Sequence, residues 1–521
     1  MEPLPWASFP AAMLATVLCF LVAVLCLRRR HQRARKYNIP PGPRPWPVIG
    51  NLNLIGSLPY RSIHKLSTRY GPLMSLRFGS FPVVVGSSVD MARFFLKTND
   101  LAFLDRPRTA AGKHTVYNYS GMMWSPYGAY WRQARKLWVT ELLGARRLRS
   151  TEHVRDEEVR AMLHDLRAAS SGGRAVVLKD HLFMVILNVF SRMVLGKKYV
   201  VAEPGSAATP EQFRWMIEEI LFLNGAFHIG DLIPWLNWLD PMGYIRRMKR
   251  LSKKFDRFLE HVLDEHNDRR QRGDEVFVAK DMVDVLLELA DDQNLEVPIQ
   301  RDGVKAFILE LITGGTDTTA VMIEWAVCEL LRKPNVLAKA TEELDRVVGR
   351  DRLVVEGDIP SLPYLEAIVK ETMRLYPVGP LLSPRLSRED VRVGGYDIPA
   401  GTRVLVNVWA IGRDPAVWGD AAAEFRPERF VGSAVDVKGK DFELLPFGSG
   451  RRMCPALGLG LKMVQVTLAN LVHAFAWRLP DGVAGEELSM EEKFTISMSR
   501  KVPLKAVAEP KLPAHLYAAG P

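Results

Sequence analysis

The sequence contains little cysteine and lacks several motifs that mark well-known chemistries. Four cysteines among 521 residues are too few for a disulfide scaffold. Glycine (38) and proline (34) are near average usage, which excludes collagen-like and low-complexity chains. No GxxxxGKS/T phosphate loop and no HExxH zinc motif occur, and the glycines at 448 and 450 lack the third glycine of a dinucleotide fingerprint. What remains is a globular chain whose chemistry must lie in other residues.

The chain carries a formal net charge of +11 at pH 7, an excess that could serve nucleic acid, an anionic membrane or an acidic partner. Much of this charge is concentrated in one place. Six cations directly follow the apolar segment Ala11–Leu27: Arg28, Arg29, Arg30, Arg33, Arg35 and Lys36. They would lie against anionic headgroups, each contributing on the order of 1 kcal/mol. We therefore expect membrane association and no nucleic-acid partner.

The segment Ala11–Leu27 has no charged residue. A helix of this length spans about 25 Å, near the lower limit for crossing a bilayer. A cleaved signal peptide, the alternative, has its cations before the apolar core. Here Glu2 precedes the core and the cations follow it. By the positive-inside rule, this order predicts a single uncleaved N-terminal transmembrane helix with the rest of the chain in the cytosol.

The proline density between Pro40 and Pro47 forbids helix and favours stiff, extended backbone. We therefore divide the chain into an anchor with its basic flank (residues 1–36), a proline-rich hinge with the segment after it (37–59) and one large domain (60–521). Helical periodicity dominates that domain, which predicts a mostly α fold with small β-sheets. The clearest helices are Trp131–Leu142, Phe255–Asn267, Val304–Leu331 and Pro363–Leu375, and the clearest strands are Met74–Phe78, Pro82–Val85 and Arg403–Val408.

The strongest chemical pattern is FGSGRRMCPALG at residues 447–458. Cys454 follows a glycine-rich, arginine-bearing turn and precedes an apolar helical run, Leu457–Phe475. Backbone N–H groups and the dipole at a helix start stabilise a thiolate, and glycines let the backbone pass close to a flat ligand. A lone buried cysteine is usually structural, so the interpretation depends on the complete spacing. That spacing, F-x-x-G-x-R-x-C, resembles the haem-binding loop of the cytochrome P450 superfamily.

Three further patterns are weak when each is taken alone. Glu371 and Arg374 share a helix face, as many surface ion pairs do. Residues 314–319 place two glycines and three threonines in an apolar helix, which indicates either a weak, tightly packed helix or a local distortion that opens a groove. Trp131 and Arg135, one turn apart, also fit an ordinary amphipathic helix.

Beside the cysteine loop, each of these patterns resembles a cytochrome P450 motif. They are similar to the E-x-x-R pair with its later P-E-R-F segment (427–430), to the (A/G)-G-x-(D/E)-T-(T/S) helix and to W-x-x-x-R. The resemblance runs from Pro40 to about Pro503 and implies the cytochrome P450 fold. One position departs from the pattern, because Ala456 stands where the family usually has glycine. We still expect haem binding.

The resemblance also implies roles for individual residues. Cys454 would be the thiolate ligand of the iron of haem b, and Thr318 and Asp317 would support dioxygen activation and proton relay. The other cofactor-binding residues would be Trp131, Arg135, Arg385, Phe447 and Arg452. The implied activity is a monooxygenase that receives electrons from NADPH–cytochrome P450 reductase, with cytochrome b5 as an additional donor. The implied location is the endoplasmic reticulum membrane, with the catalytic domain in the cytosol.

The sequence does not identify the substrate. Details such as Asp105-Arg106-Pro107 resemble plant enzymes, among them flavonoid hydroxylases and grass enzymes that cleave tertiary terpene alcohols to homoterpenes; we favour the second, because a terpenoid suits an apolar pocket. The resemblance suggests these pocket residues: Val116, Leu309, Gly314, Val378, Leu382 and Ile496. A phenolic substrate would instead use Asn118, Ser383 or Ser497. Two other classes remain open, a haem-thiolate isomerase or dehydratase and a non-catalytic haem-binding sensor.

Overall fold

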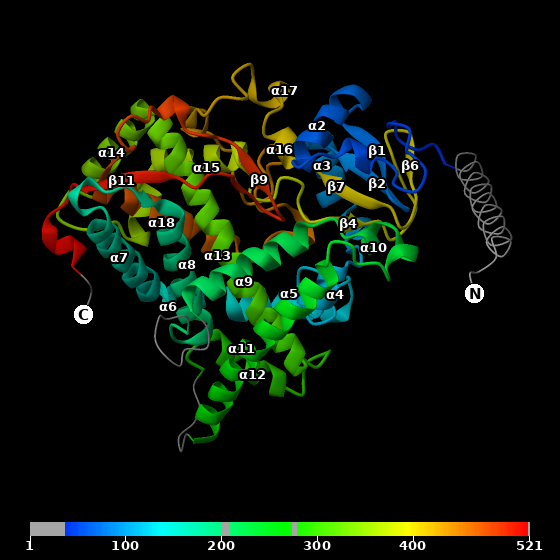
Figure 1. Ribbon diagram of the computed structural model, residues 1–521, viewed down its shortest axis with the longest axis horizontal. Coiled ribbons are helices and arrows are strands. Elements are labelled where there is room, and N and C mark those ends of the chain that lie inside the picture. Colours follow the sequence, from blue (N-terminus) through cyan, green and yellow to red (C-terminus); the bar gives the residue numbers. More distant parts are fainter. Residues whose placement is uncertain (1–36, 200–208, 273–278, 519–521) are drawn as a thin grey trace, which may run out of the picture.

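The computed structural model describes residues 37–199, 209–272 and 279–518. Most of them are helical (Figure 1). The α-helices are α2 (Pro59–Tyr70), α3 (Val89–Arg93), α4 (Ala110–Thr115), α5 (Ala129–Leu137), α6 (Ala145–Ser150), α7 (Glu152–Ala169), α8 (Leu178–Leu195), α9 (Pro210–Gly225), α10 (Ile229–Leu232), α11 (Tyr244–Arg272), α12 (Met282–Asp291), α13 (Arg301–Arg332), α14 (Pro334–Val347), α15 (Pro363–Leu375), α16 (Val408–Ile411), α17 (Pro415–Trp418) and α18 (Leu457–Ala474).

The strands form four small sheets. The largest has the order β1-β2-β7-β4, with β1 and β2 as an antiparallel hairpin and β7 parallel to β2. It lies at one end of the molecule, beside α2 and α3 (Figure 1). The strands are β1 (Leu73–Phe78), β2 (Phe81–Gly86), β3 (Val176–Val177), β4 (Arg385–Leu386), β5 (Val391–Val393), β6 (Tyr396–Ile398), β7 (Arg403–Val406), β8 (Phe475–Arg478), β9 (Glu492–Phe494), β10 (Met498–Arg500) and β11 (Lys505–Pro510). The predicted mostly helical fold with small sheets is confirmed.

Helix α13 forms the centre of the core. It packs against α8, α18 and α15, and nearly all of its side chains are buried. A helix that is apolar on every side belongs in an interior, which is why this segment shows little amphipathic character. Among the described residues, α13 is the one helix long and apolar enough to cross a bilayer, and most of its apolar window is buried inside the protein. The predicted anchor helix at 11–27 lies outside the described residues.

Some predicted boundaries shift for local reasons. The predicted helix Pro363–Leu375 matches α15, which begins with proline at a first-turn position that needs no N–H donor. The predicted helix Trp131–Leu142 is divided into α5 and a π-helical turn, η4 (Trp138–Leu142). The predicted strand Arg403–Val408 ends at Val406, because the Asn407 side chain accepts a hydrogen bond from the Ala410 N–H and caps α16.

The proline-rich segment lies along strand β1. The Ser75 N–H donates to the carbonyl oxygen of Pro41 (2.8 Å), and the Ser75 hydroxyl donates to that of Pro40 (2.8 Å). A Cβ at Gly42 would lie 1.9 Å from the Ser75 carbonyl oxygen, so only glycine permits this approach. The division of the chain at residues 36 and 59 stays a prediction.

Candidate active site

Cys454 lies in a tight loop immediately before α18. Its N–H donates to the carbonyl oxygen of Phe447 (3.0 Å), which closes the loop around the sulfur. Gly448 and Gly450 both have φ of +70°, a left-handed backbone that favours glycine. A Cβ on Gly450 would lie 2.0 Å from the Leu96 carbonyl oxygen. The glycines of the motif are therefore required by the course of the backbone.

The Cys454 sulfur accepts a hydrogen bond from the Ala456 N–H at the start of α18. Burial raises the pKa of the Cys454 thiol, and this N–H together with nearby Arg135 offsets only part of the rise. Burial is the largest of these influences on the pKa, and coordination to a metal ion would deprotonate the thiol. Ala456 has φ of −92°, which any residue can adopt, so the departure from glycine strains nothing.

A cavity of about 410 Å³ extends from the cysteine loop to α13 and α9. The structure brings most of the predicted site residues to its wall. They are Val116, Trp131, Arg135, Leu309, Gly314, Thr318, Val378, Leu382, Arg385, Phe447, Arg452, Cys454 and Ile496. Asp317 does not line the cavity: it is buried on another face of α13, where the Ser497 hydroxyl donates to its carboxylate (3.0 Å). Burial raises the pKa of Asp317. Ser497 itself does line the cavity.

Three enclosed guanidinium groups gather at one side of this cavity without a carboxylate partner among the described residues. Arg452 donates to the carbonyl oxygens of Leu104, Met122 and Ser125 and stacks on Trp131, 4.3 Å from the ring centroid. Arg385 donates to the Ser449 carbonyl oxygen (3.2 Å). Arg106 donates to those of Ser383 and Pro384 (both 2.7 Å).

These cations raise each other's electrostatic energy. Burial, with repulsion from Arg385, lowers the pKa of Arg452 to about 9, and burial lowers that of Arg385 to about 10. Burial lowers the pKa of Arg106 as well, and Arg452 adds to the shift. A buried cation cluster whose members form no ion pair with a carboxylate of the described residues fits a ligand with carboxylate groups, and guanidinium is well shaped to bind them. The side chains present therefore suit the carboxylates of a haem. Sequence reasoning assigned no role to Arg106, because one arginine in a loop carries no periodic signal.

Helix α13 has two adjacent glycines, Gly314 and Gly315, where it borders the cavity. A Cβ at Gly314 would meet nothing within 4 Å, so this position leaves open space, whereas a Cβ at Gly315 would lie 2.0 Å from the Phe190 ring. The Thr318 hydroxyl donates to the Gly314 carbonyl oxygen (2.7 Å). The α-helix is continuous through residues 314–319, so the distortion that the threonines suggested does not interrupt it. The Thr316 hydroxyl likewise donates to a carbonyl oxygen one turn back, that of Ile312 (2.7 Å).

The Glu371–Arg374 pair lies in the interior behind the cysteine loop. Arg374 forms a two-pronged ion pair with Glu371 (2.6 and 2.7 Å), and both side chains are fully buried. Arg429 of the P-E-R-F segment donates to the same carboxylate (3.0 Å). Arg374 also donates to the Gly412, Ala422 and Glu424 carbonyl oxygens. The pair is thus no surface ion pair but holds α15 against the segment 412–429.

The loop 116–125 forms part of the cavity wall through Val116, Met122, Met123 and Trp124. Its residues Tyr117, Asn118 and Tyr119 have φ of +43°, +53° and +66°, three consecutive left-handed residues that are not glycine. Asn118 is exposed and does not reach the cavity, unlike Ser383 and Ser497. The expectation that Asn118 offers a polar partner to a phenol is therefore wrong, because the left-handed turn directs this residue to the surface.

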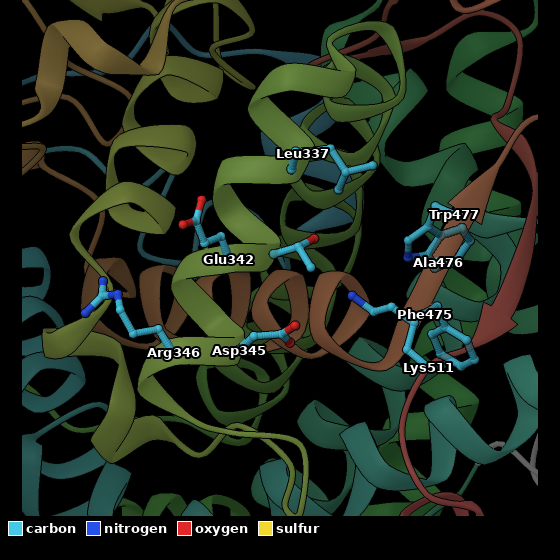
Figure 2. A pocket seen from close by; sticks show the side chains of 10 residues that line it. Leu337, Glu342, Asp345, Arg346, Phe475, Ala476, Trp477 and Lys511 are labelled. Atoms are coloured by element: carbon cyan, nitrogen blue, oxygen red, sulfur yellow. The ribbon is translucent and has the colours of Figure 1, made fainter.

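A second hollow, of about 730 Å³, is an open surface groove between α14 and β8 (Figure 2). Phe475 and Trp477 form one wall, and Glu342, Asp345 and Arg346 lie across from them. The groove adjoins the C-terminal end of α18, whereas Cys454 precedes its start. The two ends of that helix are about 25 Å apart. This groove is therefore separate from the cysteine site.

Comparison with known proteins bears on the same residues. A family description, Cytochrome P450, matches residues 40–504. This chain belongs to the cytochrome P450 family. It is a cytochrome P450 monooxygenase, and the family implies a haem-thiolate cofactor.

Plant cytochromes P450 are among the most similar relatives. The chain is 52% identical to a trimethyltridecatetraene synthase of Zea mays, over 97% of this chain and 95% of that protein. It is also 52% identical to a dimethylnonatriene synthase of Zea mays, over 98% of this chain and 97% of that protein. A flavonoid 3'-monooxygenase of Arabidopsis thaliana is 42% identical over 98% and 99%.

Solved structures agree on the fold. A zebra fish cytochrome P450 crystallised with progesterone superposes with a TM-score of 0.73 and 24% identity, over 87% of this chain and 99% of that one. A second structure of a zebra fish cytochrome P450, with abiraterone, superposes with a TM-score of 0.72. At this identity the likeness shows the fold alone.

Proposed function

We propose that this cytochrome P450 oxidises an open-chain terpenoid alcohol and that the oxidation ends in C–C cleavage of the homoterpene type. The observation that carries the proposal is the 52% identity, over nearly the whole chain, to two maize enzymes named for homoterpene hydrocarbons. The cavity supports it. Its wall near Cys454 and Thr318 is mainly apolar, with Val116, Leu309, Val378, Leu382 and Ile496 from separate parts of the chain. Such a wall suits a flexible hydrocarbon chain.

The residues divide into those that hold the cofactor and those that serve the substrate side. Cys454 would ligate the iron of haem b, and Arg106, Arg385 and Arg452 would bind its carboxylates. When bound, the haem supplies dioxygen activation. Each turnover would take one dioxygen, two electrons and two protons. In C–C cleavage to a hydrocarbon, the other fragment leaves as a carbonyl compound that keeps the alcohol oxygen, the substrate gives up two hydrogens, and both atoms of dioxygen end as water. Thr318 lies on the cavity wall, where its hydroxyl donates to the Gly314 carbonyl oxygen and its own oxygen can accept a hydrogen bond. Ser497 connects that wall to the buried carboxylate of Asp317.

Electrons would come from NADPH–cytochrome P450 reductase, whose docking face we expect to be acidic; cytochrome b5 would be a further donor. Exposed cations lie on α5, on α6 and in the cysteine loop: Lys136, Arg146, Arg149 and Arg451. Lys136→Ala and Arg149→Ala should slow reduction by the reductase, and the loss should shrink as salt is added. Reduction rates that do not respond to salt would contradict this docking face.

Exposed aromatic residues support a location at the endoplasmic reticulum membrane. Trp235 and Trp238 are 63% and 80% exposed, and Trp46 is 61% exposed. Their two segments flank the turn of the β1–β2 hairpin, since the Ser80 N–H donates to the Leu232 carbonyl oxygen and Gly50 pairs with Phe78. Tryptophan prefers the membrane–water interface. Brominated lipids should quench the fluorescence of the wild type more than that of a W235S/W238S variant.

The decisive experiment is turnover by microsomes that contain the protein and its reductase. Pooled tertiary terpene alcohols and flavonoids are supplied with NADPH, and volatile and soluble products are separated and identified by mass spectrometry. We expect a hydrocarbon shortened by C–C cleavage from a terpene alcohol. A hydroxylated flavonoid in its place would favour the second candidate, which the polar cavity residues Ser383 and Ser497 support. Cys454→Ala should abolish the carbon monoxide spectrum of thiolate-ligated haem in either case.

A further inference from the structure

One carboxylate lines the cavity on the substrate side, and none of the motifs includes it. Glu310 lies on α13 one turn before Gly314 and two turns before Thr318, and its side chain borders the cavity. A helix rises about 1.5 Å per residue, so the Cα atoms of Glu310 and Thr318 are about 12 Å apart. Its place among apolar lining residues such as Val116 and Leu309 needs a reason, because a carboxylate withdrawn from water costs free energy unless it is hydrogen-bonded.

Only part of the hydrogen-bonding capacity of Glu310 is used by the protein. The Met122 N–H donates to one oxygen (2.6 Å), and the Met123 N–H donates to the other (3.2 Å). No lysine or arginine forms an ion pair with it within the described part of the chain. A carboxylate offers about four acceptor positions, so roughly two remain. Burial raises the pKa of Glu310 to about 7, which the two N–H groups and the more distant Arg452 only partly offset.

The surrounding loop is shaped to bring the backbone to this carboxylate. A Cβ on Gly121 would lie 2.2 Å from a Glu310 oxygen, so the approach requires glycine at that position. The Tyr130 hydroxyl holds the Ser120 carbonyl oxygen (2.6 Å), and the Trp124 indole N–H donates to Asn224 (2.9 Å). The carboxylate is therefore fixed in place, with its free acceptor positions beside the cavity.

We propose that Glu310 is a specificity-determining residue whose carboxylate accepts a hydrogen bond from a hydroxyl group of the substrate. The inference rests on the proposed function and narrows it: the substrate carries an alcohol or phenol O–H, and the hydrocarbon chain beyond that hydroxyl faces Thr318. Hydroxyl-free terpene hydrocarbons of the same length would enter the same apolar cavity but without this anchor. A site built to bond a hydroxyl discriminates strongly against a ligand that lacks one.

The test uses matched ligands as well as matched variants. Binding of a tertiary terpene alcohol and of its methyl ether is measured on the full-length holoenzyme by spectral titration and by equilibrium dialysis. For the wild type we expect the alcohol to bind about tenfold more tightly than the ether, as for a hydrogen bond to a charged group. Glu310→Met, an apolar side chain of similar length, should remove that preference. Glu310→Gln, which keeps an acceptor oxygen, should restore part of it.

A purely structural role gives a different result. If Glu310 only holds the loop 116–125, Glu310→Met weakens the alcohol and the ether by the same factor, and the proposal is overturned. Tyr130→Phe is the control, because it removes the hydroxyl that holds the Ser120 carbonyl oxygen and keeps the Glu310 carboxylate; it should lower both affinities while leaving a preference for the alcohol.

Failure of the proposed function is distinguishable from failure of this inference. If terpene alcohols do not bind but a flavonoid binds more tightly than its methyl ether, and only when Glu310 is present, the substrate class is wrong and the anchor holds. If terpene alcohols are cleaved while Glu310→Met leaves the preference for the alcohol unchanged, the function holds and the anchor is refuted.

Discussion

The adjacent glycines of α13 allow a sharp test of how the cavity is built. Replacing either by alanine adds the same methyl group to the same helix, and alanine favours helix over glycine by about 1 kcal/mol. The surroundings differ. At Gly314 the methyl group would meet nothing within 4 Å, whereas at Gly315 it would lie 2.0 Å from the Phe190 ring.

The expected magnitudes follow from this difference. Gly314→Ala should stabilise the domain by up to about 1 kcal/mol, because only the helix term changes. Gly315→Ala should lose about 1 to 3 kcal/mol to overpacking, which cancels or exceeds the same gain. For a domain of this length, 1 kcal/mol corresponds to about 1 °C in the unfolding midpoint. The midpoints of the two variants should therefore differ by about 1 to 3 °C.

Thermal scans of the two purified holoenzymes at one scan rate measure that difference. Phe190→Leu provides the control, because a smaller side chain makes room for the methyl group. The G315A/F190L double variant should be more stable than the sum of the single changes predicts. If Gly315→Ala proves as stable as Gly314→Ala, or if Phe190→Leu adds independently, the packing of α13 against α8 is not as described.

Three further outcomes are expected. Thr318→Ala should divert electrons from product to free hydrogen peroxide, measured against NADPH consumed; unchanged coupling would remove this hydroxyl from the proton route. Glu371→Gln should destabilise the domain by about 3 to 5 kcal/mol, read from denaturant unfolding, because it leaves Arg374 buried without its counter-charge. Burial lowers the pKa of His266, but the hydrogen bond to Asp281 and its negative charge raise that pKa above 6.5. The His266–Asp281 pair therefore stabilises the fold fully below about pH 6.5, and this stabilisation is lost as pH rises through the folded pKa. His266→Gln should make the unfolding free energy less dependent on pH across that window.

The sequence predicts the parts of this site that rest on local backbone rules. The cysteine loop needs Gly448 and Gly450 for their left-handed backbone, and helix α15 begins at a proline. Such requirements can be read from residues that are adjacent in the sequence. The course of α13 was also predictable, because a long apolar segment has to be buried.

The residues that were missed depend on contacts between distant segments. Glu310 meets the loop at Gly121 only after folding, and Arg106 joins Arg385 and Arg452 from another part of the chain. One signal was available for Glu310, since it shares a helix face with Gly314. The prediction that Asn118 lines the cavity was wrong because the tripeptide 117–119 contains no glycine, so the sequence does not indicate a left-handed turn there.

The three left-handed residues at 117–119 have a consequence for the evolution of the enzyme. Each is held in a conformation that costs on the order of 1 kcal/mol for a residue with a side chain, and glycine would remove most of that cost. The position of Asn118 at the surface makes it the easiest of the three to exchange. A lineage selected only for heat resistance would gain by such an exchange, yet it would loosen the loop that frames the cavity. The strain in this turn is therefore the cost of a loop that is held in one conformation beside the cavity.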